Sequence, residues 1–193
     1  MTVLPRERFV PESLTEIAYV DTAIQVANGR HIVAPMVLAR LIQEANVSSD
    51  DLVQVIGCGT GYAAAILSNM SKAVVLVEDQ PEVCDKAEAL FIELGIDNVL
   101  VFKTDLVNGC KKQAPFNIII ICGAVEEIPI NLVNQLVEGG RIITMILASE
   151  GGSYPTTKAT ILTKYNGKLV EKEVFEVNTP KIKSFKKKKV FKF

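Results

Sequence analysis

Hydrophobic and polar positions follow two different periods along this chain. Short apolar, β-branched runs alternate with stretches in which apolar residues recur at helical spacing. The runs predict strands at 52–57, 73–78, 98–103, 117–122 and 140–147, and the other stretches predict helices at 12–19, 35–45, 61–70, 81–94 and 129–137. Such alternation favours an α/β fold with a largely parallel sheet, which binds ligands at the carboxyl ends of its strands.

The C-terminal part of the chain has a different pattern. Two strand-like segments, 157–163 and 168–176, flank Asn166-Gly167, a dipeptide that favours tight hairpin turns. We therefore expect a β-hairpin at the edge of the sheet. The whole chain, 1–193, is expected to form one domain. Its expected parts are a substrate-side cap at 1–50, a cofactor-binding core at 51–148, and a hairpin with a lysine-rich tail at 149–193.

The most informative segment joins the first predicted strand of the core to the helix after it. The sequence Gly57-Cys58-Gly59-Thr60-Gly61 follows an apolar run and precedes an alanine-rich stretch. Glycine suits such a turn because the backbone takes unusual angles and a ligand approaches the main chain closely. The dinucleotide fingerprint G-x-G-x-x-G would require glycine at position 62, where Tyr62 stands. The pattern G-x-G-x-G is instead that of methyltransferases that use S-adenosylmethionine (SAM).

An acidic residue stands at the end of the next predicted strand. Glu78 follows Gly61 by 17 residues. A carboxylate at this place can accept hydrogen bonds from both hydroxyls of a ribose. A glycine turn alone could be purely structural, but the loop and the acid together predict a nucleoside cofactor.

Composition and charge indicate the class of protein and its expected partners. Hydrophobic residues make up 49% and charged residues 22% of the 193 positions, as in ordinary globular proteins. The formal charge is −1, and seven lysines in 181–193 leave −8 on residues 1–180. We expect the lysines at 186–189 to be solvated, and the tail aromatics Phe185, Phe191 and Phe193 to pack on the domain. Residues 1–6 contain no apolar signal segment, so a cytoplasmic protein is expected. We also expect a monomer that binds neither nucleic acid nor membrane, because the otherwise acidic chain repels phosphates.

The sulfur and imidazole groups argue against two other classes of site. The cysteines are scattered, without a C-x-x-C pair, which favours free thiols in a reducing compartment; they are Cys58, Cys84, Cys110 and Cys122. With His31 as the single histidine, neither a zinc site nor a Ser-His-Asp triad is expected. No metal is therefore predicted.

Several distant segments resemble the protein-L-isoaspartate O-methyltransferase family. The glycine loop by itself marks only the superfamily, but the blocks at 5–11 and 128–141 make the match specific. The other matching segments are 18–21, 29–35, 56–62, 94–95, 98–99 and 114–117. The resemblance implies a seven-stranded, Rossmann-like fold of SAM-dependent methyltransferases. Such a fold has helices on both faces of the sheet and a C-terminal antiparallel β-hairpin.

The same resemblance implies a reaction. It is methylation, by SAM, of the abnormal α-carboxyl that isoaspartate formation leaves in damaged proteins, with S-adenosyl-L-homocysteine as the product. The partners would be isoaspartyl-containing proteins or peptides, and the role would be protein repair. The sulfonium is an activated donor and the carboxylate is already a nucleophile. Alignment and electrostatics therefore suffice, and no general base is required.

The resemblance also assigns residues by position. Contacts to the cofactor would come from the glycine loop and from the ends of the next two strands: Gly57, Cys58, Gly59, Gly61, Tyr62, Glu78, Asp79, Asp105 and Leu106. Among these, Asp105 would face the adenine amino group. Contacts to the substrate would come from Asp21, His31, Ile32 and Val33. We interpret His31 as an exposed loop residue.

Three features depart from the pattern of the family. Val33 stands where the family has a serine with an assigned catalytic role, and Val55 stands where an acid is usual. The sequence also begins almost directly at the 5–11 block, where the family usually has a further helical stretch. No catalytic side chain is therefore assigned. Two alternatives stay open: a SAM-dependent methyltransferase with a different acceptor, and a non-catalytic SAM-binding pseudo-methyltransferase that acts as a sensor or partner protein.

Overall fold

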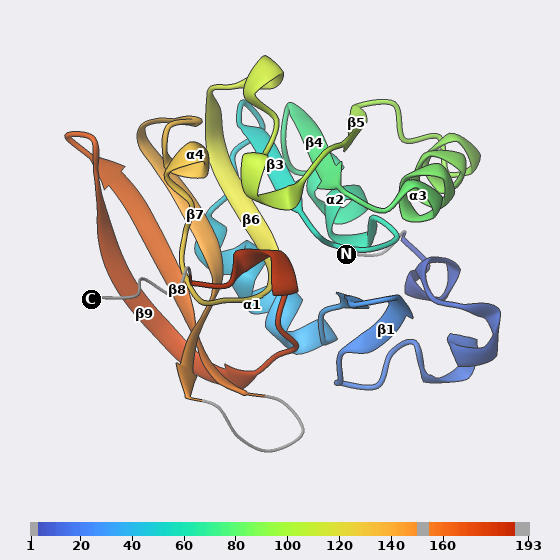
Figure 1. Cartoon of the computed structure of the whole chain (residues 1–193). Coiled ribbons are helices and arrows are strands. Elements are labelled where there is room, and N and C mark those ends of the chain that lie inside the picture. The colour runs from blue at the N-terminus through green and yellow to red at the C-terminus, as the bar shows by residue number, and fades with distance from the viewer. Residues whose placement is uncertain (1–3, 150–154, 188–193) are drawn as a thin grey trace.

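A seven-stranded sheet forms the centre of the molecule (Figure 1). The computed structural model describes residues 4–149 and 155–187. Within these residues the strand order is β5-β4-β3-β6-β7-β8-β9. The parallel strands are β3 (Leu52–Ile56), β4 (Ala73–Glu78), β5 (Val99–Lys103), β6 (Phe116–Val125) and β7 (Leu136–Ser149). The antiparallel strands β8 (Thr156–Tyr165) and β9 (Lys168–Asn178) complete the sheet and confirm the expected fold class.

The central strands are apolar on both faces because both faces are covered. In β6, Ile118 and Ile120 belong to one hydrophobic cluster, and Ile119 and Ile121 to the other. The helices α1 (Pro35–Ala45), α2 (Tyr62–Ser68) and α3 (Pro81–Glu93) contribute to the first cluster. The second cluster takes side chains from α4 (Ile130–Val133) and the 3-10 turns η3 (Leu106–Asn108) and η5 (Lys183–Phe185). A further turn, η4 (Lys111–Gln113), lies in the same β5–β6 connection as η3.

The helix expected over 129–137 is wrong in length. The structure has only the four-residue α4, and β7 begins at Leu136. The reason is a long-range pairing, in which the backbone N–H of Phe116 donates to the carbonyl of Gln135 at 2.7 Å. The side chain of Gln135 also donates to the carbonyl of Asn108 at 2.7 Å. These contacts hold the segment against the sheet instead of letting the helix continue.

The structure has two tight hairpin turns, and the sequence analysis located one of them. At the β8–β9 turn, Asn166 has φ 50° and Gly167 has φ 73°, which confirms the predicted hairpin turn. A second hairpin near the N-terminus was not predicted; it joins β1 (Ile24–Ala27) to β2 (Arg30–Ile32). Its turn carries the same dipeptide, Asn28-Gly29, which is the signal that could have found it.

The segments at the two ends of the described chain lie near the carboxyl ends of the parallel strands (Figure 1). The N-terminal segment forms the 3-10 turns η1 (Arg6–Phe9) and η2 (Glu12–Ile17), where a helix over 12–19 was expected. After β9, the tail returns to β6: the N–H of Ala124 donates to the carbonyl of Pro180, and the N–H of Ile182 donates to the carbonyl of Ala124, both at 2.9 Å.

The tail buries part of its aromatic content. Phe185 is only 1% exposed, which confirms its expected packing. Lys186 and Lys187 are exposed, as expected, whereas Lys188, Lys189, Phe191 and Phe193 lie outside the described residues. In the part of the chain that the structure describes, no helix is long and apolar enough to span a membrane.

Candidate cofactor and acceptor site

The glycine loop after β3 has a conformation that only glycine adopts easily. Gly57, Gly59 and Gly61 have φ values of +66°, +65° and +94°. Space is a second constraint. A Cβ at Gly61 would lie 2.5 Å from the Phe91 ring of α3, and one at Gly59 would lie 2.6 Å from Val26 of β1. The loop is therefore enclosed between a helix of the core and the N-terminal hairpin.

The block at 5–11 supports this loop from its other side. The rings of Phe9 and Tyr62 meet edge to face, with centroids 5.2 Å apart. The hydroxyl of Thr60 donates to the carbonyl of Phe9. Arg6 is fully buried, and its guanidinium carbon lies 4.9 Å from the centroid of the Tyr62 ring. The role of this block is therefore to fix the start of α2, a contribution that the sequence did not reveal.

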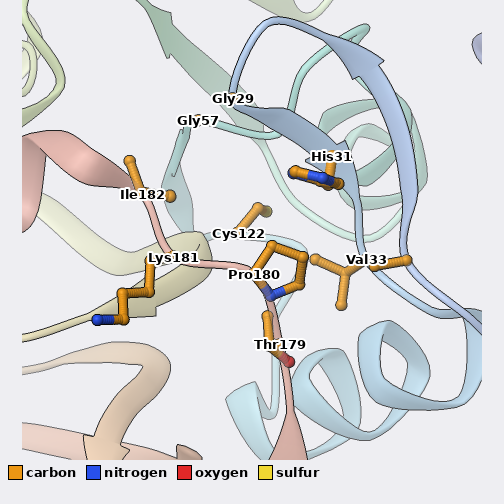
Figure 2. Close-up of a pocket in the computed structure, with 10 residues that line it drawn as sticks. Gly29, His31, Val33, Gly57, Cys122, Thr179, Pro180, Lys181 and Ile182 are labelled. Carbon is orange, nitrogen blue, oxygen red and sulfur yellow. The ribbon is translucent and has the colours of Figure 1, made fainter. Parts of the chain in front are cut away.

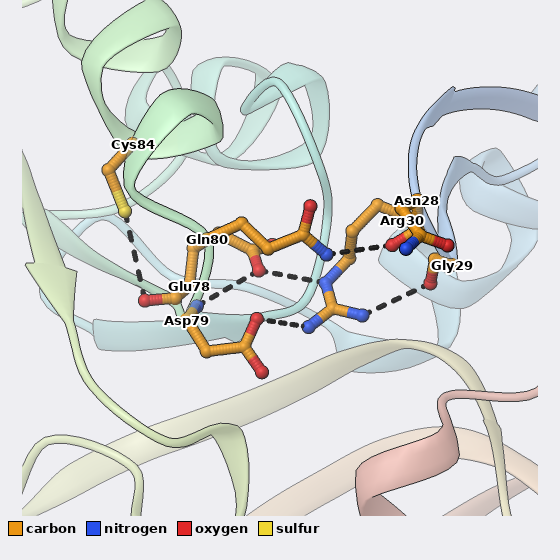
Figure 3. Close-up of polar contacts among 7 residues, drawn as sticks. All are labelled: Asn28, Gly29, Arg30, Glu78, Asp79, Gln80 and Cys84. Atoms are coloured by element: carbon orange, nitrogen blue, oxygen red, sulfur yellow. Dashed lines mark hydrogen bonds and ion pairs between the residues drawn. The ribbon is translucent and has the colours of Figure 1, made fainter.

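A buried ion-pair cluster stands at the end of β4 (Figure 3). Glu78 is 0% exposed, and its Oε1 accepts hydrogen bonds from Nε of Arg30 at 2.8 Å and from the backbone N–H of Asp79 at 2.9 Å. Nη2 of Arg30 pairs with the carboxylate of Asp79. Oε2 of Glu78 is buried and has no hydrogen-bond partner. Burial raises the pKa of Glu78, and the charge of Arg30 opposes that rise.

Arg30 is the functional residue that the sequence analysis missed here. It lies on β2, 48 positions before Glu78, and the pairing depends on how the hairpin docks on the sheet. Glu78 and Asp79 were expected at the end of β4, and the structure places both there. Their basic partner carried no signal that local pattern could have detected.

The segment after β5 reaches the glycine loop through an apolar side chain. Leu106 is fully buried, and its Cδ1 would lie 3.2 Å from a Cβ at Gly57. Ile182 of the tail lies equally near, at 3.1 Å. Asp105 is exposed and precedes η3. The structure thus brings Leu106 to the loop and leaves the carboxylate of Asp105 facing solvent.

A small cavity lies between the hairpin, the end of β6 and the tail (Figure 2). Its empty volume is about 250 Å³, including space open to solvent. The lining includes His31, Val33, Gly57 and Cys122, with residues 179–182 on the tail side. The hairpin, β6 and the tail therefore surround the end of the glycine loop.

The tail fits closely enough to constrain β6. A Cβ at Gly123 would lie 2.5 Å from Cγ1 of Ile182, so this position requires glycine for reasons of space. Lys181 forms an ion pair with Glu126 at 3.8 Å. Nothing in the sequence pattern indicated that residues 179–182 would line the cavity, because their position depends on the return of the chain after β9.

The four predicted substrate residues have different environments. His31 and Val33 line the cavity, whereas Ile32 is buried in the hydrophobic core. Asp21 accepts a hydrogen bond from the backbone N–H of Met36 at 3.0 Å, near the start of α1. The interpretation of His31 as an exposed loop residue is wrong, because it pairs with Gln25 in the β1–β2 hairpin and is half-buried. Burial and the charge of Arg30 lower its pKa.

All four cysteines are free and buried. Cys58 follows β3 and Cys122 lies in the neighbouring strand β6. A hydrogen bond between their thiols, together with burial, raises the pKa of Cys122. Burial raises the pKa of Cys84 to about 11. Among the described residues, no group of three or more metal-binding side chains is placed to hold a metal ion.

This sheet, with a glycine loop after one strand and a buried acid after its neighbour, defines the class of Rossmann-like methyltransferase folds. Residues 1–178 match the model of the family described as protein-L-isoaspartate(D-aspartate) O-methyltransferase (PCMT). The chain therefore belongs to the PCMT family. The tail residues that line the cavity follow the matched range.

Individual proteins support this assignment. A protein-L-isoaspartate O-methyltransferase of Gloeobacter violaceus is 35% identical over 177 residues, which cover 92% of this chain and 84% of that protein. A solved protein-L-isoaspartate O-methyltransferase superposes with a TM-score of 0.78 at 26% identity, over 93% of this chain; the match spans only 58% of that longer chain. A Plasmodium falciparum structure assigned to PCMT, in complex with S-adenosyl-L-homocysteine, shares the fold with a TM-score of 0.74 at 22% identity, over 93% of this chain and 86% of that chain.

Proposed function

We propose that this protein transfers a methyl group from SAM to the α-carboxylate of L-isoaspartyl residues in damaged proteins. Membership of the PCMT family and the named relatives support this activity. The observation that carries the proposal is the buried, unpartnered Oε2 of Glu78 beside the glycine loop. A buried carboxylate oxygen without a donor is costly, and a ribose hydroxyl is a donor of the right kind.

The residues of the chain divide the work of binding. The backbone of residues 57–61 would hold the amino-acid part of the cofactor, Glu78 would bind the ribose, and Asp105 would bind the adenine amino group. When bound, SAM supplies an activated methyl group. The substrate carboxylate is the nucleophile, so the protein has to align it and exclude water. The hairpin and the tail, which close the cavity, are placed to do both.

We further propose that the chain acts as a single-domain cytoplasmic monomer and binds neither nucleic acid nor membrane. The charge of −8 on residues 1–180 supports the absence of nucleic-acid binding, because it repels phosphate groups. The partners are then isoaspartyl-containing proteins or peptides alone.

One observation favours a second candidate, a methyltransferase with a different acceptor. Val33 lines the cavity and has no hydroxyl to donate to a carboxylate oxygen. An acceptor that needs no such donor would fit this wall as well. A non-catalytic SAM-binding protein is the outcome if the cofactor binds and no acceptor is methylated.

The test is methyl transfer from labelled SAM to an isoaspartyl peptide, beside the same peptide with ordinary aspartate. Labelling of the first peptide alone supports the proposal. Calorimetry with S-adenosyl-L-homocysteine tests the cofactor separately, and Glu78→Ala should weaken binding by roughly 1–3 kcal/mol. Glu93→Ala, which removes a surface ion pair with Arg8, is the control. No detectable binding to wild type at millimolar ligand would exclude every SAM-dependent function.

A further inference from the structure

The inference concerns Arg30, and it rests on the proposed SAM-dependent function. The Arg30 side chain is 6% exposed and reaches from the hairpin to the end of β4. It donates to Glu78 and Asp79, and Nη1 donates to the carbonyl of Gly29 at 3.0 Å (Figure 3). A planar guanidinium suits such a pair of carboxylates because several of its N–H groups can bind at once. The Arg30 guanidinium thus bridges the two carboxylates at the end of β4 and the turn of its own hairpin.

These contacts leave Glu78 closed to a ribose. Its Oε1 already accepts two N–H groups, and its Oε2 is enclosed without a partner. A ribose binds such a carboxylate from the carboxyl ends of the strands. Glu78 has no exposed surface, and the hairpin that carries Arg30 covers that side. Both hydroxyls can therefore reach the carboxylate only if the guanidinium moves.

The hairpin that carries Arg30 is a separate two-stranded sheet. Two further contacts fix its turn and its first strand on the site. The side chain of Gln80 donates to the carbonyl of Asn28 at 2.8 Å, and Val26 lies against Gly59 of the glycine loop. The same hairpin carries His31 into the cavity, and Val33 follows its second strand. Loss of the Arg30 contacts would remove one of the attachments that position both residues.

We propose that Arg30 is a latch that competes with the cofactor ribose for Glu78. In the closed state the guanidinium takes the position of the ribose hydroxyls, and the hairpin lies on the glycine loop. Cofactor binding displaces the guanidinium of Arg30 from Glu78. Arg30 is therefore a residue that sets cofactor affinity, and it links the cofactor side of the site to the acceptor side.

The test is the affinity for S-adenosyl-L-homocysteine in Arg30→Gln, measured by calorimetry. A latch that is closed in about 90% of molecules raises the apparent Kd about tenfold. The substitution should therefore lower the Kd by about tenfold. Arg8→Gln removes an exposed arginine that is paired with Glu93 and should leave the Kd unchanged. A Kd for Arg30→Gln that is unchanged or higher overturns the latch; a higher value would mean that Arg30 orients Glu78 for the ribose.

A second variant covers the case in which Arg30→Gln does not fold, since it leaves Glu78 buried without a cation. Arg30→Lys keeps the charge but cannot bridge Glu78 and Asp79 in the same way, so it should also lower the Kd, by a smaller factor. Hydrogen exchange in the ligand-free variant should rise in residues 24–32, and unchanged exchange there overturns the latch. If wild type and variants all fail to bind, the proposed function is overturned together with the latch. If wild type binds and neither variant binds more tightly, the latch is overturned and the proposed function stands.

Discussion

Nη2 of Arg6 donates a hydrogen bond to the backbone carbonyl of Val33 at 2.9 Å. The same guanidinium donates from Nε to the carbonyl of Ala18 at 2.6 Å and lies over the ring of Tyr62. One buried cation therefore contacts the N-terminal segment, the cavity wall and the first residue after the glycine loop. Its Nη1 has no hydrogen-bond partner.

Arg6→Met should destabilise the protein. Methionine fills part of the space, but the carbonyls of Ala18 and Val33 lose their donor, and each buried unsatisfied group costs about 1–3 kcal/mol. Chemical denaturation should show the loss in the free energy of unfolding. Arg8→Met makes the same exchange at an exposed site and should change stability by less than about 0.5 kcal/mol. Equal effects of the two substitutions would show that the buried contacts of Arg6 do not stabilise the fold.

Val33→Ser should increase methylation of isoaspartyl peptide. A hydroxyl at this wall of the cavity can donate to one carboxylate oxygen of the acceptor. A charge-assisted hydrogen bond of about 1.5–3 kcal/mol corresponds to a rate increase of roughly one to two orders of magnitude. Val33→Ala, which shortens the side chain without adding a donor, should give no such gain. Affinity for S-adenosyl-L-homocysteine should stay unchanged in both variants. A Val33→Ser enzyme no faster than wild type would mean that the hydroxyl has no role in this site.

His31 should titrate below the ordinary imidazole pKa of about 6.5. Burial is the larger cause and the positive charge of Arg30 the smaller one. Because His31 is the single histidine, its ring signals in NMR can be followed without overlap. Arg30→Gln should raise this pKa toward the ordinary value. A pKa at or above the ordinary value in wild type would contradict the burial of the ring.

The same shift predicts how His31 affects stability. Between the lowered pKa of the folded state and the ordinary pKa of the unfolded chain, the unfolded chain binds more protons. Above the ordinary imidazole pKa, His31 therefore does not lower the free energy of unfolding. As the pH falls from that value to the lowered pKa of the folded state, His31 makes the protein progressively less stable. His31→Gln should flatten the pH dependence of stability in this range, as measured by denaturation at a series of pH values. An unchanged profile would exclude His31 as its source.

Gly61→Ala should cost more stability than Gly95→Ala. Both glycines have positive φ, at +94° and +67°, so alanine is strained at either position by about 1–2 kcal/mol. A Cβ at Gly95 meets nothing within 4 Å, whereas at Gly61 it meets the Phe91 ring at 2.5 Å. Overpacking should add about 1–3 kcal/mol for Gly61 alone. Thermal unfolding of the two variants, side by side, separates strain from crowding, and equal losses would show that Phe91 moves aside freely.

Local pattern determined much of this protein. The strands β3 and β4 and the helix α1 were located within a residue of their predicted bounds, because buried apolar residues repeat with the period of the element that contains them. The glycine loop and Glu78 were equally visible. Both depend on a few residues next to one another, at the end of a strand whose direction the alternation already fixes.

Only the tertiary structure decided which distant groups meet at the loop. Arg30 pairs with Glu78 across 48 positions, Arg6 reaches Val33 across 27, and Ile182 packs on Gly57 and Gly123 from the end of the described chain. It also shortened α4, because Gln135 and Leu136 pair with the first residue of β6. These outcomes depend on how separate elements dock, and docking depends on the combined packing of the sheet, the hairpin and the tail. Hydrophobic periodicity describes which face of an element is buried, but not which partner covers it.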